Sequence, residues 1–182
     1  MSAPHETPAP SAWVMRWAGL VAEGAMVLDV ACGHGRHARF FAERGHEVLA
    51  VDRDEDALAS IAGVRGITTL HADLENAPWP LPGKTFGAVV VTNYLWRPLM
   101  SALIAALAPG GLLIYETFMR GNERYGRPSN PEFLLRPGEL LDAVSGRLEV
   151  LGFEQGVVEM PKAAVVQRIC AVRGDATLLR LP

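Results

Sequence analysis

Short apolar runs alternate with segments of helical spacing along most of the chain. Runs of strand length lie at residues 26–31, 47–52, 67–70, 86–92 and 112–117. Apolar side chains recur at helical spacing in residues 11–24, 36–45, 54–62 and 97–108. Strands that alternate with helices are joined by right-handed crossovers and form a parallel sheet with helices on both faces. The pattern therefore predicts an α/β fold.

The alternation stops after residue 117. Residues 118–138 are rich in proline, glycine and arginine and predict a long structured loop, a feature that is usually functional inside a compact domain. A helix is expected near residues 137–145, followed by two long strands at 147–159 and 164–173. Because the link between these strands is short, they must pair antiparallel. The sheet is therefore expected to end in an antiparallel pair.

The length of 182 residues and the hydrophobic content of 49% are typical of one domain with a single core. Three prolines among small and polar residues predict a mobile arm at residues 1–11, which leaves residues 12–182 as a single domain. No apolar run approaches the ~18 residues of a membrane span. These features lead us to expect a cytoplasmic protein without a membrane partner.

Charge and cysteine content exclude several function classes. A net charge of −3 disfavours general attraction to nucleic acid or to an anionic membrane, although local basic clusters remain possible partners for nucleic acid. The two cysteines, Cys32 and Cys170, are too few for a disulfide scaffold or a four-cysteine zinc site. No metal is expected, and the oligomeric state stays open.

The turn after the first predicted strand has the composition of a ligand-binding loop. Gly33 and Gly35 allow the backbone to approach a bound group closely, and the helix that follows offers unpaired N–H donors. The segment from Gly33 to Ala38 also satisfies the pattern G-x-G-x-x-G/A, and Asp52 follows at the distance of a ribose-binding acid. The motif therefore indicates an adenosine-containing ligand and leaves NAD as one candidate.

Three further features favour another adenosine ligand. Asp29 lies inside the first strand before the glycine turn, Asp73-Leu74 follows the third strand, and Pro109-Gly110-Gly111 leads into the fifth. Together with the antiparallel tail, these residues resemble the class I S-adenosylmethionine-dependent methyltransferases over residues 24–175. The loop at residues 120–140 is similar to that of small bacterial members akin to the tellurite-resistance methyltransferases.

The resemblance implies a fold, an activity and a cofactor. The implied fold is a Rossmann-like, seven-stranded and mostly parallel sheet of order 3-2-1-4-5-7-6, with an antiparallel last strand and helices on both faces. The implied enzyme transfers a methyl group from S-adenosyl-L-methionine to a small-molecule acceptor by in-line displacement and releases S-adenosyl-L-homocysteine. The alternatives are an NAD-dependent oxidoreductase, a non-catalytic cofactor-binding protein of the same fold, and a nucleic acid methyltransferase.

Cofactor-binding roles follow from the same resemblance. Asp29 would orient the loop or the ligand's amino group, Asp52 would accept the ribose hydroxyls, and Asp73 with the Leu74 backbone would meet the adenine amine. Ala31 stands where the family often has its first glycine. The full implied set of cofactor-binding residues is Asp29, Ala31, Gly33, Gly35, Asp52, Asp73, Leu74 and Asn93.

The acceptor site is less clearly marked. Tyr94 follows Asn93 at the end of the fourth strand, where the nucleophile would meet the methyl donor, and we hypothesise that Arg124, Tyr125 and Arg127 bind a small anionic substrate. Alternatively, these arginines pair with nearby acids and hold the loop in shape. The catalytic residue is unknown; the candidate bases are Tyr94, His34, His37 and Glu116, and a soft nucleophile needs none.

Overall fold

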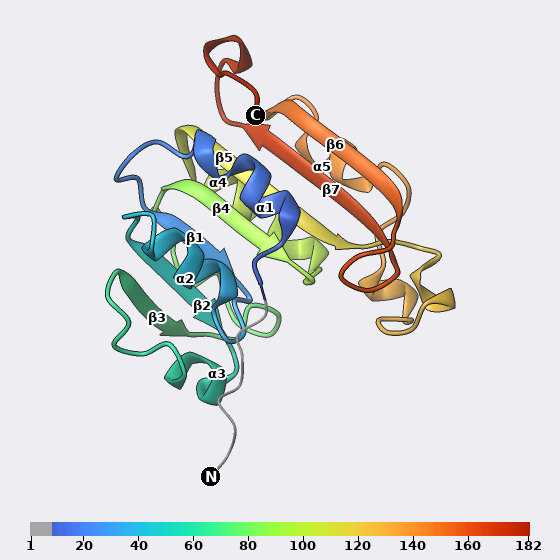
Figure 1. Ribbon diagram of the computed structural model, residues 1–182, viewed down its shortest axis with the longest axis horizontal. Helices are drawn as coiled ribbons and strands as arrows, with labels where there is room; N and C mark the ends of the chain where they lie inside the picture. Colours follow the sequence, from blue (N-terminus) through green and yellow to red (C-terminus); the bar gives the residue numbers. More distant parts are fainter. Residues whose placement is uncertain (1–8) are drawn as a thin grey trace.

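The computed structural model describes residues 9–182 and contains one mixed seven-stranded sheet (Figure 1). The strands are β1 (Val27–Val30), β2 (Val48–Asp52), β3 (Ile67–His71), β4 (Phe86–Thr92), β5 (Leu107–Phe118), β6 (Glu149–Val158) and β7 (Ala164–Val172). They lie in the order β3-β2-β1-β4-β5-β7-β6. Strands β1 to β5 pair parallel, whereas β7 pairs antiparallel with both β5 and β6. The predicted fold class and strand order are confirmed.

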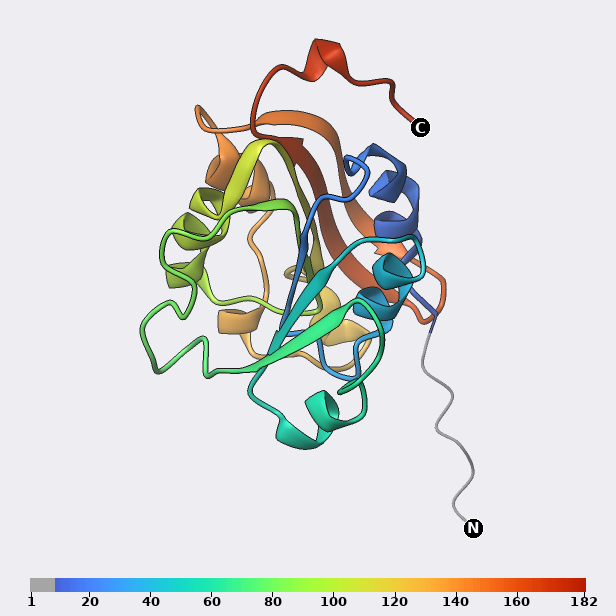
Figure 2. The same cartoon turned by 90° about the vertical axis from the view of Figure 1, so that its left-hand side faces the viewer.

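Helices cover both faces of this sheet. Helices α1 (Ala12–Trp17) and α2 (Arg36–Ala42) lie on one face, and α4 (Met100–Ala105) and α5 (Glu139–Val144) lie on the other (Figures 1 and 2). Helix α3 (Glu55–Ala59) follows β2. The sheet therefore separates two apolar layers, as expected when parallel strands are buried on both sides.

The side chains of strand β4 alternate between these two layers. Val89 and Val91 pack in the cluster that contains Leu103 of α4, whereas Val90 packs in the cluster that contains Phe41 of α2. All five of these residues are at most 1% exposed. Because successive side chains point to opposite faces, an uninterrupted run of β-branched residues satisfies both layers.

Two predicted helices differ from the observed ones. The segment expected to be helical over 11–24 is α-helical only over Ala12–Trp17 and then tightens into a 3-10 turn at Ala18–Leu20. The segment expected to be helical over 97–108 begins with a 3-10 turn, ends its α-helix at Ala105, and is already part of β5 at Leu107. The strand predicted to begin at residue 112 therefore misses the first part of β5. In that part, the pairing of β5 with β4 shifts register between Phe86 and Ala88.

The predicted loop after β5 is present and is held by specific bonds. Met119 and Leu135 form an isolated bridge that closes the loop at its base. The Arg97 guanidinium donates to the Glu132 carbonyl at 2.6 Å and forms an ion pair with Glu139 at 2.6 Å. The loop is therefore anchored on α5 and on the turn before α4.

Of the arm expected at residues 1–11, positions 1–8 lie outside the described residues. Ser11 is described: its backbone N–H donates to His37 Nε2 at 3.1 Å, and its hydroxyl donates to Glu116 Oε1 at 2.8 Å. The start of α1 is therefore tied to α2 and to β5. Within residues 9–182, no helix has the length and apolar content to cross a membrane.

Candidate functional site

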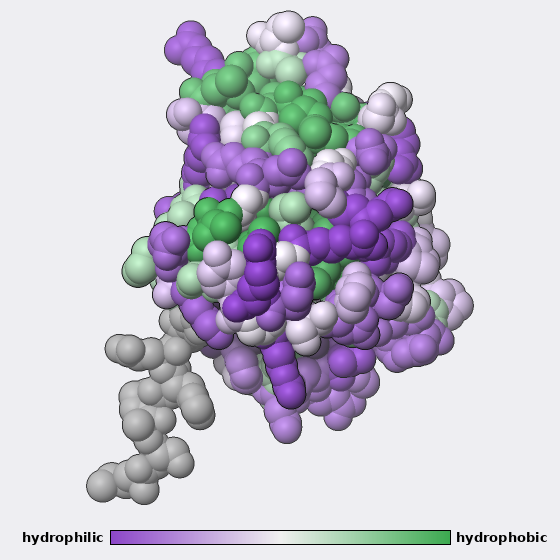
Figure 3. Space-filling model, turned by 90° about the vertical axis from the view of Figure 1, so that its right-hand side faces the viewer, coloured by the Kyte–Doolittle hydropathy of each residue, from purple (hydrophilic) through white to green (hydrophobic). Residues whose placement is uncertain are grey.

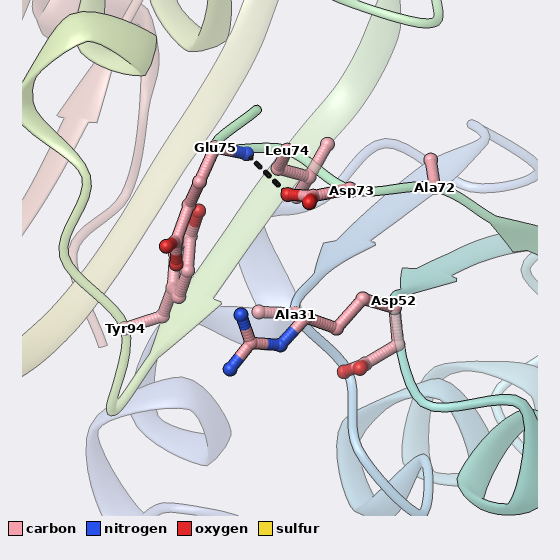
Figure 4. Close-up of a pocket in the computed structure, with 8 residues that line it drawn as sticks. Ala31, Asp52, Ala72, Asp73, Leu74, Glu75 and Tyr94 are labelled. Atoms are coloured by element: carbon pink, nitrogen blue, oxygen red, sulfur yellow. Dashed lines mark hydrogen bonds between the residues drawn. The ribbon is translucent and has the colours of Figure 1, made fainter. Parts of the chain in front are cut away.

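The carboxyl ends of β1 to β4 surround a cavity of about 110 Å³. This is the edge at which open α/β sheets bind ligands, because the loops after neighbouring parallel strands meet there. Figure 4 shows residues from the ends of β1, β2, β3 and β4 around this space. We call this space the first cavity. It is lined by Ala31, Asp52, Arg53, Ala72, Asp73, Leu74, Glu75 and Tyr94.

The turn between β1 and α2 adopts the left-handed backbone that its glycines allow. Ala31, Gly33 and Gly35 have φ values of 52°, 53° and 71°. A Cβ added to Gly35 would lie 2.8 Å from two carbons of Ile61, so this glycine is required by packing. A Cβ added to Gly33 would have no neighbour within 4 Å. The backbone at Gly33 therefore faces open space that a ligand can approach.

Two carboxylates of the first cavity are held by backbone donors. The Asp52 carboxylate accepts the Gly33 N–H at 2.7 Å and the Asp54 N–H at 2.9 Å. Asp73 accepts the Glu75 N–H at 2.9 Å and also bonds to the side chain and backbone of Asn76. These hydrogen bonds lower the pKa of Asp73, and the bond from the Asn76 side chain contributes most. Asp73 Oδ1 accepts both backbone N–H groups, whereas Asp73 Oδ2 and the two Asp52 oxygens accept one bond each and keep a lone pair for a hydroxyl or amine.

Asp29 is buried beneath the glycine turn, with 1% of its surface exposed. Burial raises the pKa of Asp29 to about 7, and the hydrogen bond from the Ala38 backbone together with the Arg36 guanidinium offsets only part of that effect. Its Oδ2 atom is buried and has no hydrogen-bond partner among residues 9–182. A buried carboxylate oxygen without a partner is costly, so this position suits a donor or cation that a ligand brings.

A second cavity, of about 460 Å³, lies between the start of α1, the loop after β5 and the link between β6 and β7. Asn93 lines this second cavity, whereas its neighbour Tyr94 lines the first. Asn93 has a φ of 54°, and its N–H donates to the Glu116 carbonyl at 2.9 Å. The end of β4 therefore separates the two cavities.

Among residues 9–182, Glu116 is the one carboxylate that lines the second cavity. Its Oε2 lies 2.5 Å from Arg168 Nε in an ion pair, and its Oε1 accepts the Ser11 hydroxyl. Both carboxylate oxygens of Glu116 are therefore engaged by partners within the protein. His37 lies nearby, and burial together with Arg36 lowers the pKa of its imidazole to about 3, which keeps it neutral.

The structure separates the residues that the sequence grouped as an acceptor site. Tyr125 and Arg127 line the second cavity, but Arg124 does not; its Nε donates to the Gly121 carbonyl at 3.2 Å within the same loop. Tyr94 lines the first cavity instead, and its buried hydroxyl has no partner within the described chain. His34 is exposed, lies 3.4 Å from the Ser60 hydroxyl and lines neither cavity.

Several residues of the second cavity carry no signal in the sequence. Arg36 follows the glycine turn, Lys162 lies in the link between β6 and β7, and Arg168 lies on β7. They meet because β7 pairs with β5 and because α1 crosses the same edge. A pattern of local spacing does not reveal such a juxtaposition.

A seven-stranded sheet in this order, with one acid at the end of β2, another after β3 and a glycine turn after β1, defines the class I methyltransferase architecture. Residues 27–111 match the family model described as "Methyltransferase domain". A Mycolicibacterium smegmatis protein named as a probable S-adenosylmethionine-dependent methyltransferase is 33% identical over 144 residues, which are 72% of this chain and 52% of the relative. The chain thus spans about half the length of this curated relative.

Solved structures share the fold. TehB from Haemophilus influenzae has a TM-score of 0.79 at 18% identity, covering 93% of this chain and 64% of its own. An S-adenosylmethionine-dependent methyltransferase from Mesorhizobium loti has a TM-score of 0.67 at 21% identity, with 87% and 97% covered. The family model, the curated relative and the shared fold together support a class I S-adenosylmethionine-dependent methyltransferase, a family whose cofactor is S-adenosyl-L-methionine.

Proposed function

We propose that this protein transfers a methyl group from S-adenosyl-L-methionine to a small-molecule acceptor and releases S-adenosyl-L-homocysteine. The observation that carries the proposal is the first cavity, where Asp52 and Asp73 offer acceptor oxygens beside the open backbone of Gly33. An adenosine presents ribose hydroxyls and an exocyclic amine, which are the donors that two neighbouring carboxylates require.

The residues present fit this cofactor. Asp52 would hold the ribose, Asp73 with the Leu74 backbone would hold the adenine, and the unpartnered Oδ2 of Asp29 would meet the amino group of the methionine part. Gly33 and Gly35 keep the turn in the conformation that allows this approach, with Ala31 before them. Asn93 would lie where the methionine part meets the acceptor.

The chemistry that the cofactor supplies is a methyl group activated by the positive charge of its sulfonium. The chain's own contribution is to hold and orient the two reactants and to exclude water, and positioning alone lowers such a barrier substantially. The second cavity, on the other side of Asn93, would hold the acceptor. Its volume of about 460 Å³ is in the range of small-molecule sites.

The candidate bases differ in how well their surroundings suit proton transfer. Burial, followed by the negative charge of Glu75 and Asp73, raises the pKa of Tyr94 well above its ordinary value, so its phenol stays protonated and would act as a hydrogen-bond donor. Both oxygens of Glu116 are engaged by Arg168 and Ser11, and His34 lines neither cavity. We therefore propose catalysis by positioning, on an acceptor atom that needs no protein base.

Thermal denaturation with added ligands tests the proposed cofactor against NAD. S-adenosyl-L-homocysteine at 100 times its Kd would stabilise the native state by about 2.7 kcal/mol, which shifts the midpoint of a protein of this size by several degrees. NADH at the same concentration is expected to leave the midpoint unchanged. Stabilisation by NADH alone would overturn the proposal in favour of an oxidoreductase.

A further inference from the structure

The second cavity combines an apolar wall with cationic side chains, and this combination defines the chemical class of its occupant. Apolar side chains line it from α1, the end of β5, the end of β6, the link that follows and the start of β7; among them are Met15, Phe118, Val158, Met160 and Val166. Met15 and Met160 are 45% and 77% exposed, so the apolar wall continues to the rim. Such surface favours the apolar body of an organic ligand.

The cations of this cavity outnumber its acids. Arg36, Arg127, Lys162 and Arg168 contribute positive charge, and Glu116 contributes the single negative charge found among the lining residues at positions 9–182. Arg168 is paired with Glu116 at 2.5 Å and with Glu154 at 3.3 Å. Across the described chain, no carboxylate lies within 4.0 Å of the cationic groups of Arg36, Arg127 or Lys162.

This charge imbalance does not extend over the whole surface, because the chain as a whole carries a net charge of −3. The unpaired cations come from three separate parts of the chain: the start of α2, the loop after β5 and the link between β6 and β7. Viewed from the side of β6 in Figure 1, the surface interleaves apolar patches with strongly hydrophilic residues (Figure 3). An anion with an apolar body matches both components.

We infer that the methyl acceptor is an amphipathic organic anion, a small molecule with an apolar body and a carboxylate or similar anionic group. The inference rests on the proposed function and names the substrate class of its acceptor site. Arg127 and Lys162, with Arg36, bind the anionic group, and the Phe118 and Val166 wall packs against the body. A guanidinium matches a carboxylate through two parallel hydrogen bonds, whereas a neutral analogue leaves these donors unpaired.

Binding measurements that need no turnover test the inference. The protein saturated with S-adenosyl-L-homocysteine is titrated with phenylbutyrate and octanoate, and in parallel with phenylbutyramide and octanamide, which keep the body and remove the charge. The carboxylates are expected to bind at least about tenfold more tightly than the amides, which is a difference of about 1.4 kcal/mol. Their affinity should fall with added salt, whereas that of the amides should not.

Variants assign the effect to the cavity. Arg127→Ala combined with Lys162→Ala should weaken carboxylate binding about tenfold and leave amide binding unchanged. Arg65→Ala is the control, because it removes one exposed positive charge near the amino end of β3, away from the second cavity. It should leave the affinity for both probe classes unchanged. Intact S-adenosyl-L-homocysteine binding confirms that each variant is folded.

The outcomes separate this inference from the proposed function. If S-adenosyl-L-homocysteine fails to bind the wild-type protein, the proposed function fails. If it binds, but the carboxylates fail to bind at millimolar concentration or bind no better than the amides, only the anionic acceptor is overturned. The same holds if Arg65→Ala weakens carboxylate binding as much as the double variant does.

Discussion

Gly33 provides the sharpest test of how closely a ligand approaches the turn after β1. The change is Gly33→Ala, with Gly83→Ala as a matched control. Both glycines lie in the left-handed region, at φ values of +53° and +74°, and an added Cβ meets no atom within 4 Å at either position. Gly83 lies in the loop before β4 and does not line either cavity. Gly33 borders the first cavity through its N–H, which donates to Asp52, so the two substitutions share a backbone conformation and differ in their position relative to that cavity.

The magnitude follows from the backbone. A Cβ in left-handed backbone costs about 1 kcal/mol, and no steric clash adds to it at either glycine, so both variants should lose about 1 kcal/mol of unfolding free energy. That loss lowers the melting temperature by about 2–4 °C in a domain of this size. Gly35→Ala should lose more, because its Cβ would lie 2.8 Å from carbons of the fully buried Ile61.

Ligand affinity separates the two variants. In Gly33→Ala the new methyl group occupies space that the cofactor needs, so the affinity for S-adenosyl-L-homocysteine should fall at least about tenfold, a loss of about 1.4 kcal/mol. Gly83→Ala should bind as the wild type does. Urea denaturation without ligand and calorimetric titration measure the two quantities. Wild-type affinity in Gly33→Ala, or an equal loss in Gly83→Ala, would refute the proposed approach at Gly33.

Two further predictions concern Asp29 and Ala31. Because burial raises the pKa of Asp29 from 3.8 to about 7, the native state keeps a proton that the unfolded chain has released, so this group's stabilisation is lost as pH rises between these values. Urea denaturation across that pH range gives the unfolding free energy of the wild type and of Asp29→Asn. The difference between the two proteins should shrink as pH rises, because the opposite effect of buried His37 is present in both and cancels. Two curves that run parallel with pH would contradict the prediction. Ala31 has a φ of 52°, so Ala31→Gly should raise the unfolding free energy by about 0.5 kcal/mol, and a decrease would show that the turn is not strained.

Four of the eight residues predicted to bind the cofactor line the first cavity, because local determinants bring them together: Ala31, Asp52, Asp73 and Leu74. A strand, a glycine turn and a helix follow one another directly, and acids placed after β2 and β3 necessarily meet at the same edge of a parallel sheet. The strand order followed from the family resemblance and is confirmed. Helix ends were predicted less well, since apolar spacing continues through 3-10 turns and into β5 without a break.

The second cavity could not be predicted because it depends on tertiary contacts. Arg124 and Arg127 are two arginines of the same loop, and the sequence does not distinguish them. The 3-10 turn at Asn122–Arg124 directs Arg124 back to the Gly121 carbonyl, whereas Arg127 lines the cavity. The Ser11 side chain caps α1, a contact within the helix, and its hydroxyl also donates to Glu116, 105 positions away along the chain. Such contacts depend on the packing of α1 against β5, which no local pattern encodes.

Calorimetric titration with S-adenosyl-L-methionine, of the wild type and of Asp52→Asn, tests the central claim most directly. The wild type should bind one equivalent. Asp52→Asn keeps an oxygen that can accept the Gly33 N–H but loses the charged acceptor of the ribose hydroxyls, so its affinity should fall by about 1–3 kcal/mol. Absence of binding to the wild type would contradict the proposed function, and unchanged affinity in Asp52→Asn would remove the ribose role of Asp52.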